Sequence, residues 1–319
     1  MAFDGPTTTP RIVRSLSPEA RRRERLGLYA GDLQAGPTPS WQSRLAEVVR
    51  RTTIGTYNDG FIHAGNLAYL SMLAIFPFFI LGAAIFELIG GRDQAEALIE
   101  TVLLALPPTV ASVIQPAAGD VIYARSGWLL WFGAGIGLWT VSSLVESIRD
   151  ILRRAYGTQP SHAFWKSRLL SAGLILGAVV LLMASLFAQV AIGAAQQVID
   201  ARLPQLAEAI GTLRLSRIVP GIGLTLSLYM LFYTLTPVRY RTKEYPKWPG
   251  ALFTAAWWLG VTIAMPPILR GFFAYDLTYG SLAGIIIALL FFWLVGLGLV
   301  IGAELNAALA EPERETEEK

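Results

Sequence analysis

The sequence predicts an all-α, polytopic membrane protein with six transmembrane helices, and three observations support that fold class. Hydrophobic residues make up 54% of the 319-residue chain and charged residues only 15%, whereas about one quarter of an average soluble chain is charged. Six long apolar stretches carry almost no charge. Lysine and arginine are concentrated in the connections on one side of these stretches, as expected for the cytoplasmic side of a membrane.

Each apolar stretch is long enough to cross the hydrocarbon core of a bilayer, which takes about 20 helical residues. The stretches cover residues 66–86, 127–145, 169–195, 218–238, 248–269 and 281–303. Lipid offers no partner for backbone N–H and C=O groups, so each stretch must be a helix unless it alternates as a barrel strand does. The continuous apolar run at 291–295 shows no alternation, so we expect helices.

The distribution of positive charge predicts the orientation of the chain. Connections on the same side as the N-terminus contain 20 lysine and arginine residues, and those on the other side contain 6. The positive-inside rule therefore places both termini in the cytoplasm, and the even number of spans agrees.

Three regions follow from this pattern. Residues 1–40 are rich in Pro, Arg, Thr and Gly and have little apolar surface to bury, which predicts a disordered, basic cytoplasmic arm. No apolar segment typical of a cleavable signal peptide occurs before His63. Residues 41–310 form the six-helix membrane domain, and residues 311–319 form a charged cytoplasmic tail.

An amphipathic pattern begins at Trp41, before the first span. One helical face carries Trp41, Leu45, Val48, Val49 and Thr52. Arg44, Arg50 and Arg51 lie toward the other face. This favours an interfacial helix that leads into the first span, and the alternative is a soluble helix packed on loops.

Two outer connections, 92–126 and 196–217, are too long to be simple turns. In the first, Leu98, Val102 and Leu106 recur every four residues until Pro107-Pro108 ends the helix. These connections either form a small extracytoplasmic cap or lie on the outer leaflet, and both alternatives stay open.

Residue types that carry catalysis are scarce. The chain has no cysteine, which excludes disulfides, thiolate metal sites and cysteine nucleophiles. His63 and His162 have no carboxylate or second histidine at ligand spacing, and no phosphate-binding glycine motif occurs. We therefore expect no metal, no cofactor, no catalytic residues and no enzymatic activity.

Charged groups at the cytoplasmic ends of the second and sixth spans form a candidate polar cluster. Its members are Glu146, Arg149, Asp150, Arg153, Glu304 and Asn306. The first four fall at i, i+3, i+4 and i+7 on one helical face. Glu304 reaches the same depth and is expected to pair with Arg149 or Arg153. The cluster serves either as a gate or substrate site or as a clamp between helices.

Glycines at GxxxG spacing occur at Gly173 and Gly177, and again at Gly298 and Gly302. This spacing favours close packing of helices and supports dimerisation only weakly.

Two motifs at opposite ends of the membrane domain resemble the YihY/BrkB family of bacterial inner-membrane proteins. The run GNLAYLSMLAIFP at 65–77 resembles the start of that family's first span. YGSL at 279–282, followed by a long apolar run and GAELN at 302–306, resembles its last span. Segments 235–239 and 249–251, with Trp257 beyond them, are similar to its fourth-to-fifth connection, and the resemblance covers residues 41–310.

The resemblance implies a six-span protein of the bacterial inner membrane without an established biochemical activity. Family members have carried the label ribonuclease BN, but the residues that RNA hydrolysis needs are absent here. Other relatives are linked to export of lipid A precursors. We therefore expect a transporter or flippase for a lipid or other amphiphile, and the alternative is a non-catalytic scaffold or envelope-integrity factor. The expected partners are membrane lipids and an amphiphilic or anionic lipid substrate, and not nucleic acid.

Candidate cavity or hinge residues lie in or beside these motifs. Pro77 lacks an amide hydrogen in the middle of the first span and is expected to bend it toward the bundle interior. The full candidate set is Asn66, Tyr69, Ser71, Pro77, Trp257, Tyr279 and Gly280.

Overall fold

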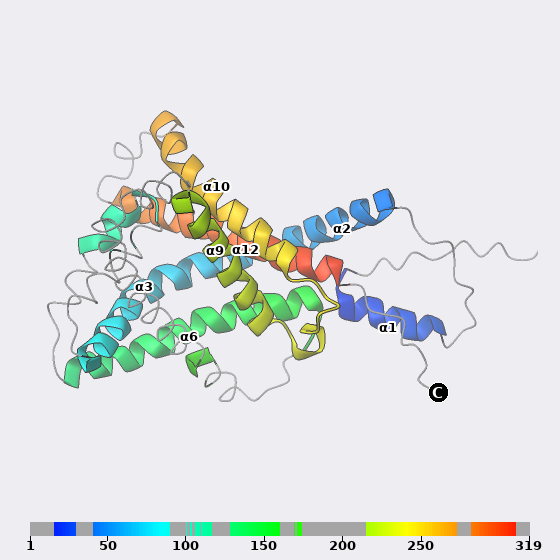
Figure 1. Ribbon diagram of the computed structural model, residues 1–319, viewed down its shortest axis with the longest axis horizontal. Coiled ribbons are helices and arrows are strands. Elements are labelled where there is room, and N and C mark those ends of the chain that lie inside the picture. The colour runs from blue at the N-terminus through cyan, green and yellow to red at the C-terminus, as the bar shows by residue number, and fades with distance from the viewer. Residues whose placement is uncertain are drawn as a thin grey trace, which may run out of the picture.

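The computed structural model describes residues 16–29, 41–89, 100, 103, 106–108, 110–116, 128–159, 169, 171–173, 215–272 and 282–310. Within these residues every regular element is a helix and no strand occurs, which confirms the all-helical prediction. Figure 1 shows the long helices gathered in one bundle, with α1 (Pro18–Tyr29) and α2 (Trp41–Gly55) extending from the same end of it.

Five long helices coincide with five of the six predicted apolar stretches. They are α3 (Phe61–Ile89), α6 (Trp128–Tyr156), α9 (Leu215–Leu235), α10 (Trp248–Phe272) and α12 (Ala283–Leu309). The predicted stretch at 169–195 lies outside the described residues, except for residue 169 and residues 171–173, which are helical.

Two helical segments of the described chain, Trp248–Leu269 and Ala283–Leu309, are long and apolar enough to cross a membrane. A third is obtained if Trp41–Asn58 and Phe61–Pro77 are taken as one span bent by 60°. The structure thus supports a helical membrane protein, and the six-span topology stays a prediction.

Large apolar side chains cover the outside of the bundle. Ile62 of α3, Trp128 of α6 and Ile263 of α10 are each 73% exposed. A soluble monomer rarely exposes so much contiguous apolar surface, but lipid solvates it without cost.

Helix α12 is central to the bundle, because it packs against α2, α3, α6 and α10. Its contact with α10 is close, and we call it the α10–α12 seam. The seam consists of Gly250, Thr254 and Trp257 of α10 and Leu294, Gly298, Gly302 and Asn306 of α12.

Polar bonds run along the seam between the two helices. The Trp257 indole N–H donates to the carbonyl of Leu294 at 2.8 Å. Asn306 accepts a bond from the backbone amide of Gly250, also at 2.8 Å, and donates to the carbonyl of Lys247 at 3.1 Å.

Small residues make the close approach of α10 and α12 feasible. A Cβ atom on Gly302 would lie 2.8 Å from the carbonyl oxygen of Gly250, and one on Gly298 would overlap the Trp257 ring. The close packing expected from the spacing of Gly298 and Gly302 is therefore confirmed. Gly173, the described member of the other glycine pair, has no heavy atom within 4 Å of its Cβ position.

The N-terminal arm differs from the prediction, because part of it is a helix. We expected residues 1–40 to be disordered, but Pro18–Tyr29 forms α1. Ser17 caps this helix by accepting a bond from the Ala20 amide at 3.3 Å, and Pro18 fits the first helical position. Glu19 adds ion pairs to Arg22 and Arg23. Composition failed as a guide here because α1 is held by capping and polar docking, which need little apolar surface.

Helix α2 confirms the helix predicted from Trp41 onward. Trp41, Leu45 and Val49 are exposed on one face, while Arg51 is buried and pairs with Glu47 at 2.8 Å. This arrangement agrees with the apolar stripe read from the sequence and leaves that stripe uncovered by protein. Its location at the membrane interface stays a prediction.

The first long outer connection contributes to the core. Residues 110–116 are helical and follow Pro107-Pro108, so a helical segment begins after the proline pair as well. Val110 and Ile114 are fully buried in a cluster with Phe79, Met265 and Phe291. This part of the connection therefore packs on the bundle, and the choice between a cap and a segment on the leaflet stays open. The second outer connection, 196–217, lies outside the described residues before 215, as does the tail at 311–319.

Candidate functional site

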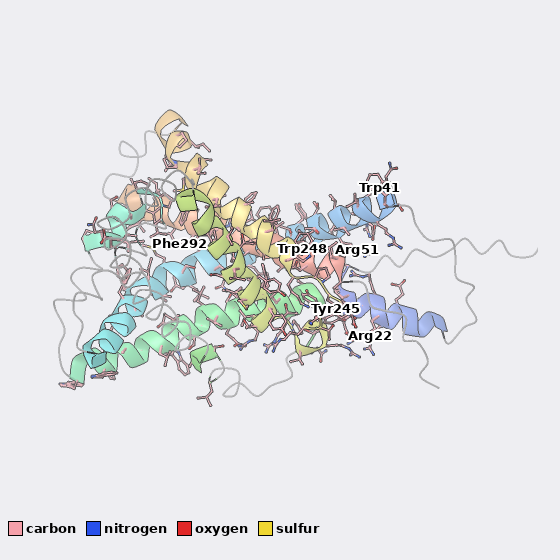
Figure 2. All side chains as sticks on the ribbon, viewed as in Figure 1. Arg22, Trp41, Arg51, Tyr245, Trp248 and Phe292 are labelled. Carbon is pink, nitrogen blue, oxygen red and sulfur yellow. The ribbon has the colours of Figure 1, made fainter. Side chains whose placement is uncertain are left out.

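A pocket of about 140 Å³ lies near the end of the bundle from which α1 and α2 extend. Four stretches of the chain, within 16–17, 55–63, 151–155 and 300–304, supply its walls. The lining residues are Leu16, Ser17, Gly55, Asn58, Gly60, His63, Ile151, Arg154, Ala155, Val300 and Glu304. Figure 2 shows Arg51 of α2 and Tyr245 at this end of the molecule, and Phe292 toward the other.

The pocket owes its shape to a break between α2 and α3. The two helices are joined by the π-helix η1 (Thr56–Gly60), and their axes differ by 60°. A π-helical turn is wider than an α-helical turn and occurs often at functional sites. Because of this turn, Asn58 and Gly60 enter the pocket wall together with His63 at the start of α3.

Glycines in η1 and at the end of α2 allow α12 to approach this break closely. A Cβ atom on Gly55 would overlap the carboxylate of Glu304, and one on Gly60 would lie 3.2 Å from Val300. The glycines therefore let the Glu304 side chain enter the pocket from α12.

Besides the Ser17 hydroxyl, four polar side chains line the pocket. Glu304 and His63 are half-buried, whereas Arg154 and Asn58 are exposed. The pocket thus has an acidic group and an imidazole in its interior and a guanidinium and an amide near its opening. These groups have the chemistry to bind a small charged or zwitterionic group through hydrogen bonds and charge.

The predicted polar cluster on α6 forms as an ion-pair network. Glu146 pairs with Arg149 and, at 3.3 Å, with Arg153, which also pairs with Asp150 at 3.0 Å. The buried Ser171 hydroxyl lies 3.3 Å from the Glu146 carboxylate. Glu146 therefore contacts another segment of the protein, whereas the Asp150 side chain is 54% exposed, and the inward orientation of the whole charged face stays a prediction.

The remaining two members of that predicted cluster lie elsewhere. Glu304 lines the pocket, whose walls include Arg154 and neither Arg149 nor Arg153. Asn306 is 1% exposed and belongs to the α10–α12 seam. Pairing of Glu304 with Arg149 or Arg153 stays a prediction.

The predicted cavity and hinge residues are spread over three places. Asn66 donates to the Ser147 hydroxyl of α6 at 2.9 Å, Tyr69 is 60% exposed, and Ser71 is half-buried. Trp257 lies in the seam, and Tyr279 and Gly280 lie outside the described residues.

Pro77 is a point of contact between helices. Helix α3 continues through it, and a Cβ atom on Gly137 of α6 would lie 2.6 Å from the Pro77 carbonyl oxygen. The expected bend at Pro77 stays a prediction.

Sequence reasoning missed the groups that complete this end of the molecule. Arg21 is 1% exposed, and Tyr240 of the 3-10 helix η2 (Val238–Tyr240) is also 1% exposed. The signal for Arg21 was present in the order Ser17-Pro18-Glu19, which is typical of a helix start. Arg154 and the pocket residues of η1 carried no such signal, because their proximity depends on how three helices pack.

Lys247 is a buried cation just before α10. It is 3% exposed, donates to the carbonyl of Thr242 at 2.7 Å and lies over the Tyr245 ring. Burial, together with the nearby charge of Arg241, lowers the pKa of Lys247 to about 8.

Stability is therefore expected to rise with pH above this pKa. Between the folded pKa of about 8 and the ordinary value of 10.5, the unfolded chain holds a proton that the folded chain has released, so raising the pH favours folding. We expect the free energy of unfolding to rise by about 2 kcal/mol between roughly pH 7.5 and 9.5. Denaturation of the detergent-solubilised protein at several pH values measures this rise. Lys247→Met should remove the rise, the exposed Lys243→Met should keep it, and an unchanged rise in Lys247→Met would refute the assignment.

Among the described residues, no group of three or more histidine, aspartate or glutamate side chains is arranged to hold a metal ion. The described residues form a bundle of apolar helices with a small charged pocket at one end. It defines the chain as a helical membrane protein.

The comparisons with known proteins identify its family. A family model described as "Virulence factor BrkB" matches residues 56–319, and the chain belongs to this family. The resemblance drawn from the two end motifs is thereby confirmed.

Two relatives cover most of the chain. The chain is 26% identical over 284 residues to the ribonuclease-like protein YfkH of Bacillus subtilis. The matched region covers 84% of this chain and 95% of the relative. The chain is also 23% identical over 258 residues to the UPF0761 membrane protein PSHAa0171 of Pseudoalteromonas translucida. That match covers 78% of this chain and 81% of the relative. No solved structure is a significant match.

Proposed function

We propose that this protein is a six-span protein of the bacterial inner membrane, with both termini in the cytoplasm, that moves a lipid or other amphiphile with a charged head group. The observation that supports this most is the pocket at the α2–α3 break. It combines Glu304, His63 and Arg154 within a bundle whose outer surface is apolar.

The chemistry of an amphiphile matches this combination. Its head group needs polar partners shielded from lipid, and its acyl chains need an apolar surface beside them. The pocket is smaller than the several hundred Å³ typical of drug-sized ligands, so it suits a head group and not a whole lipid. The exposed apolar residues Phe61 and Ile62 adjoin His63 on α3 and offer a surface for the chains.

Reconstitution tests the proposal. The protein is placed in vesicles of phosphatidylethanolamine and phosphatidylglycerol that contain a phospholipid with a fluorescent acyl chain, and a membrane-impermeant reductant reports its movement between leaflets. We expect facilitated movement that Glu304→Gln slows about tenfold, because the substitution removes a charge from the pocket. Arg44→Gln, at an exposed position of α2 outside the pocket, is the matched control and should leave the rate unchanged.

Two outcomes contradict transport. Movement at the rate of protein-free vesicles for all lipids tested would favour the non-catalytic scaffold. An equal rate in Glu304→Gln and wild type, with both eluting as the same folded species, would mean that the pocket takes no part in the movement.

A further inference from the structure

The start of α1 is docked on the end of α12. The Arg21 guanidinium is 1% exposed and donates to the carbonyls of Ala307 and Ala310, both at 2.9 Å. It also donates to the carbonyl of Leu16. The last carbonyls of a helix have no amide partner of their own and lie at the negative end of the helix dipole. Arg21 therefore caps α12 from a segment almost 290 residues away in the sequence.

A second contact holds the same segment from the side. The Tyr240 hydroxyl donates to the Glu19 carboxylate at 2.8 Å. Burial raises the pKa of Tyr240, so its phenol keeps the proton that it donates. The Tyr240 ring packs against that of Tyr156 at the end of α6, with 5.0 Å between centroids.

A third contact fits Ser17 onto the turn after α6. Gly157 has a φ of 71°, which favours glycine, and a Cβ atom there would overlap the Ser17 hydroxyl. Ser17 and Leu16 are at the same time part of the pocket wall. The residues that these three contacts hold in place thus close one side of the pocket.

We propose that residues 16–21 are a removable plug over the pocket, and that the docking of Arg21 on α12 controls access to it from the cytoplasm. Leu16 and Ser17 of the plug share the pocket wall with Arg154, Ala155 and Glu304. This inference concerns access to the pocket and holds whether or not the pocket binds an amphiphile.

The plug is suited to release because its attachments are polar. Within residues 16–24 the buried side chains are those of Pro18 and Arg21, and neither is a large apolar side chain. The carbonyls that Arg21 leaves behind are those at the end of a helix, where water is the ordinary partner. Water can therefore replace these bonds at low net cost.

Cysteine labelling tests the plug directly, because the chain has no cysteine of its own. Ala155→Cys reports on the pocket, where the native residue is 4% exposed. Its reaction rate with a water-soluble maleimide is compared in the wild-type background and with Arg21→Met, which keeps an apolar stem and removes the donors. We expect about a tenfold faster reaction in Arg21→Met and an intermediate rate in Arg21→Lys, which keeps the charge but lacks the planar fork.

Two controls separate plug release from general loosening. Arg23→Met, on the same helix with a side chain 70% exposed, should leave the rate at Ala155→Cys unchanged. Ala288→Cys, in the fully buried core cluster around Phe291, should stay unreactive in the Arg21→Met background. Equal rates at Ala155→Cys with and without Arg21, or a parallel increase at Ala288→Cys, would overturn the proposal.

Discussion

Replacing Gly250 with alanine is expected to lower the unfolding free energy of the detergent-solubilised protein by about 3 kcal/mol. The added Cβ atom would lie 2.6 Å from Cγ of Asn306 and would overlap the carbonyl oxygen of Gly302. One of these atoms is backbone and the other belongs to a side chain that is 1% exposed. Neither can move without separating α10 from α12 and breaking the bonds from Asn306 to Gly250 and Lys247.

Gly260 of the same helix is the matched control. No heavy atom lies within 4 Å of its Cβ position, so Gly260→Ala meets no obstacle and gains helix propensity worth up to about 1 kcal/mol. Thermal unfolding followed by size-exclusion fluorescence compares the two variants. If Gly250→Ala proves as stable as Gly260→Ala, the α10–α12 seam is not packed as described.

Gly137→Ala is expected to have the second largest effect, a loss of about 2 to 3 kcal/mol. Its Cβ atom would lie 2.6 Å from the carbonyl oxygen of Pro77 and 3.2 Å from the Pro77 Cβ. The proline ring fixes the backbone at this point, so α3 cannot relax by a local rotation. Relief requires α3 and α6 to move apart along an extensive contact.

Gly135, two residues earlier on α6, provides the comparison. It has no heavy atom within 4 Å of its Cβ position, and Gly135→Ala should be neutral or slightly stabilising. The same unfolding assay applies, and Pro77→Ala should reduce the effect of Gly137→Ala without removing it, because the carbonyl remains while the backbone gains freedom to relax. A Gly137→Ala protein with the wild-type midpoint would contradict the contact between Pro77 and α6.

Much of the fold could be predicted from composition and length alone. A run of apolar residues without charge requires a helix in lipid wherever it occurs, and Trp248 was predicted as the first residue of the span that α10 contains. The spacing of Gly298 and Gly302 also predicted a close helix contact, because small residues four apart share one face. These features depend on local sequence.

The candidate site depended on information that is not local. Glu304 lies beside Gly55 because a π-helical turn bends the chain between α2 and α3. Packing over the whole bundle determines which face of α12 points toward that turn. Arg154 and Arg153 differ by one position and face different surroundings, which depth in the membrane does not distinguish. Depth alone grouped Glu304 with Arg149 and Arg153, and that pairing stays a prediction.

The arm before α2 illustrates the opposite error. Its sequence has a helix start at Ser17-Pro18, but composition argued for disorder. Helix α1 is held by Arg21 and Glu19, whose partners on α12 and η2 come from the last third of the chain. Polar docking of this kind leaves no apolar periodicity for sequence analysis to detect.

Photocrosslinking tests most directly whether the pocket at the α2–α3 break holds the head group of an amphiphile. A phospholipid with a photoreactive group on its head is added to the reconstituted protein, and crosslinked peptides are mapped with and without excess unlabelled lipid. We predict competable crosslinks at 55–63, 151–155 and 300–304, the segments that contain the helical pocket residues, and their loss in Glu304→Gln. Crosslinks confined to lipid-facing positions such as Ile263, unaffected by competition, would contradict head-group binding in the pocket.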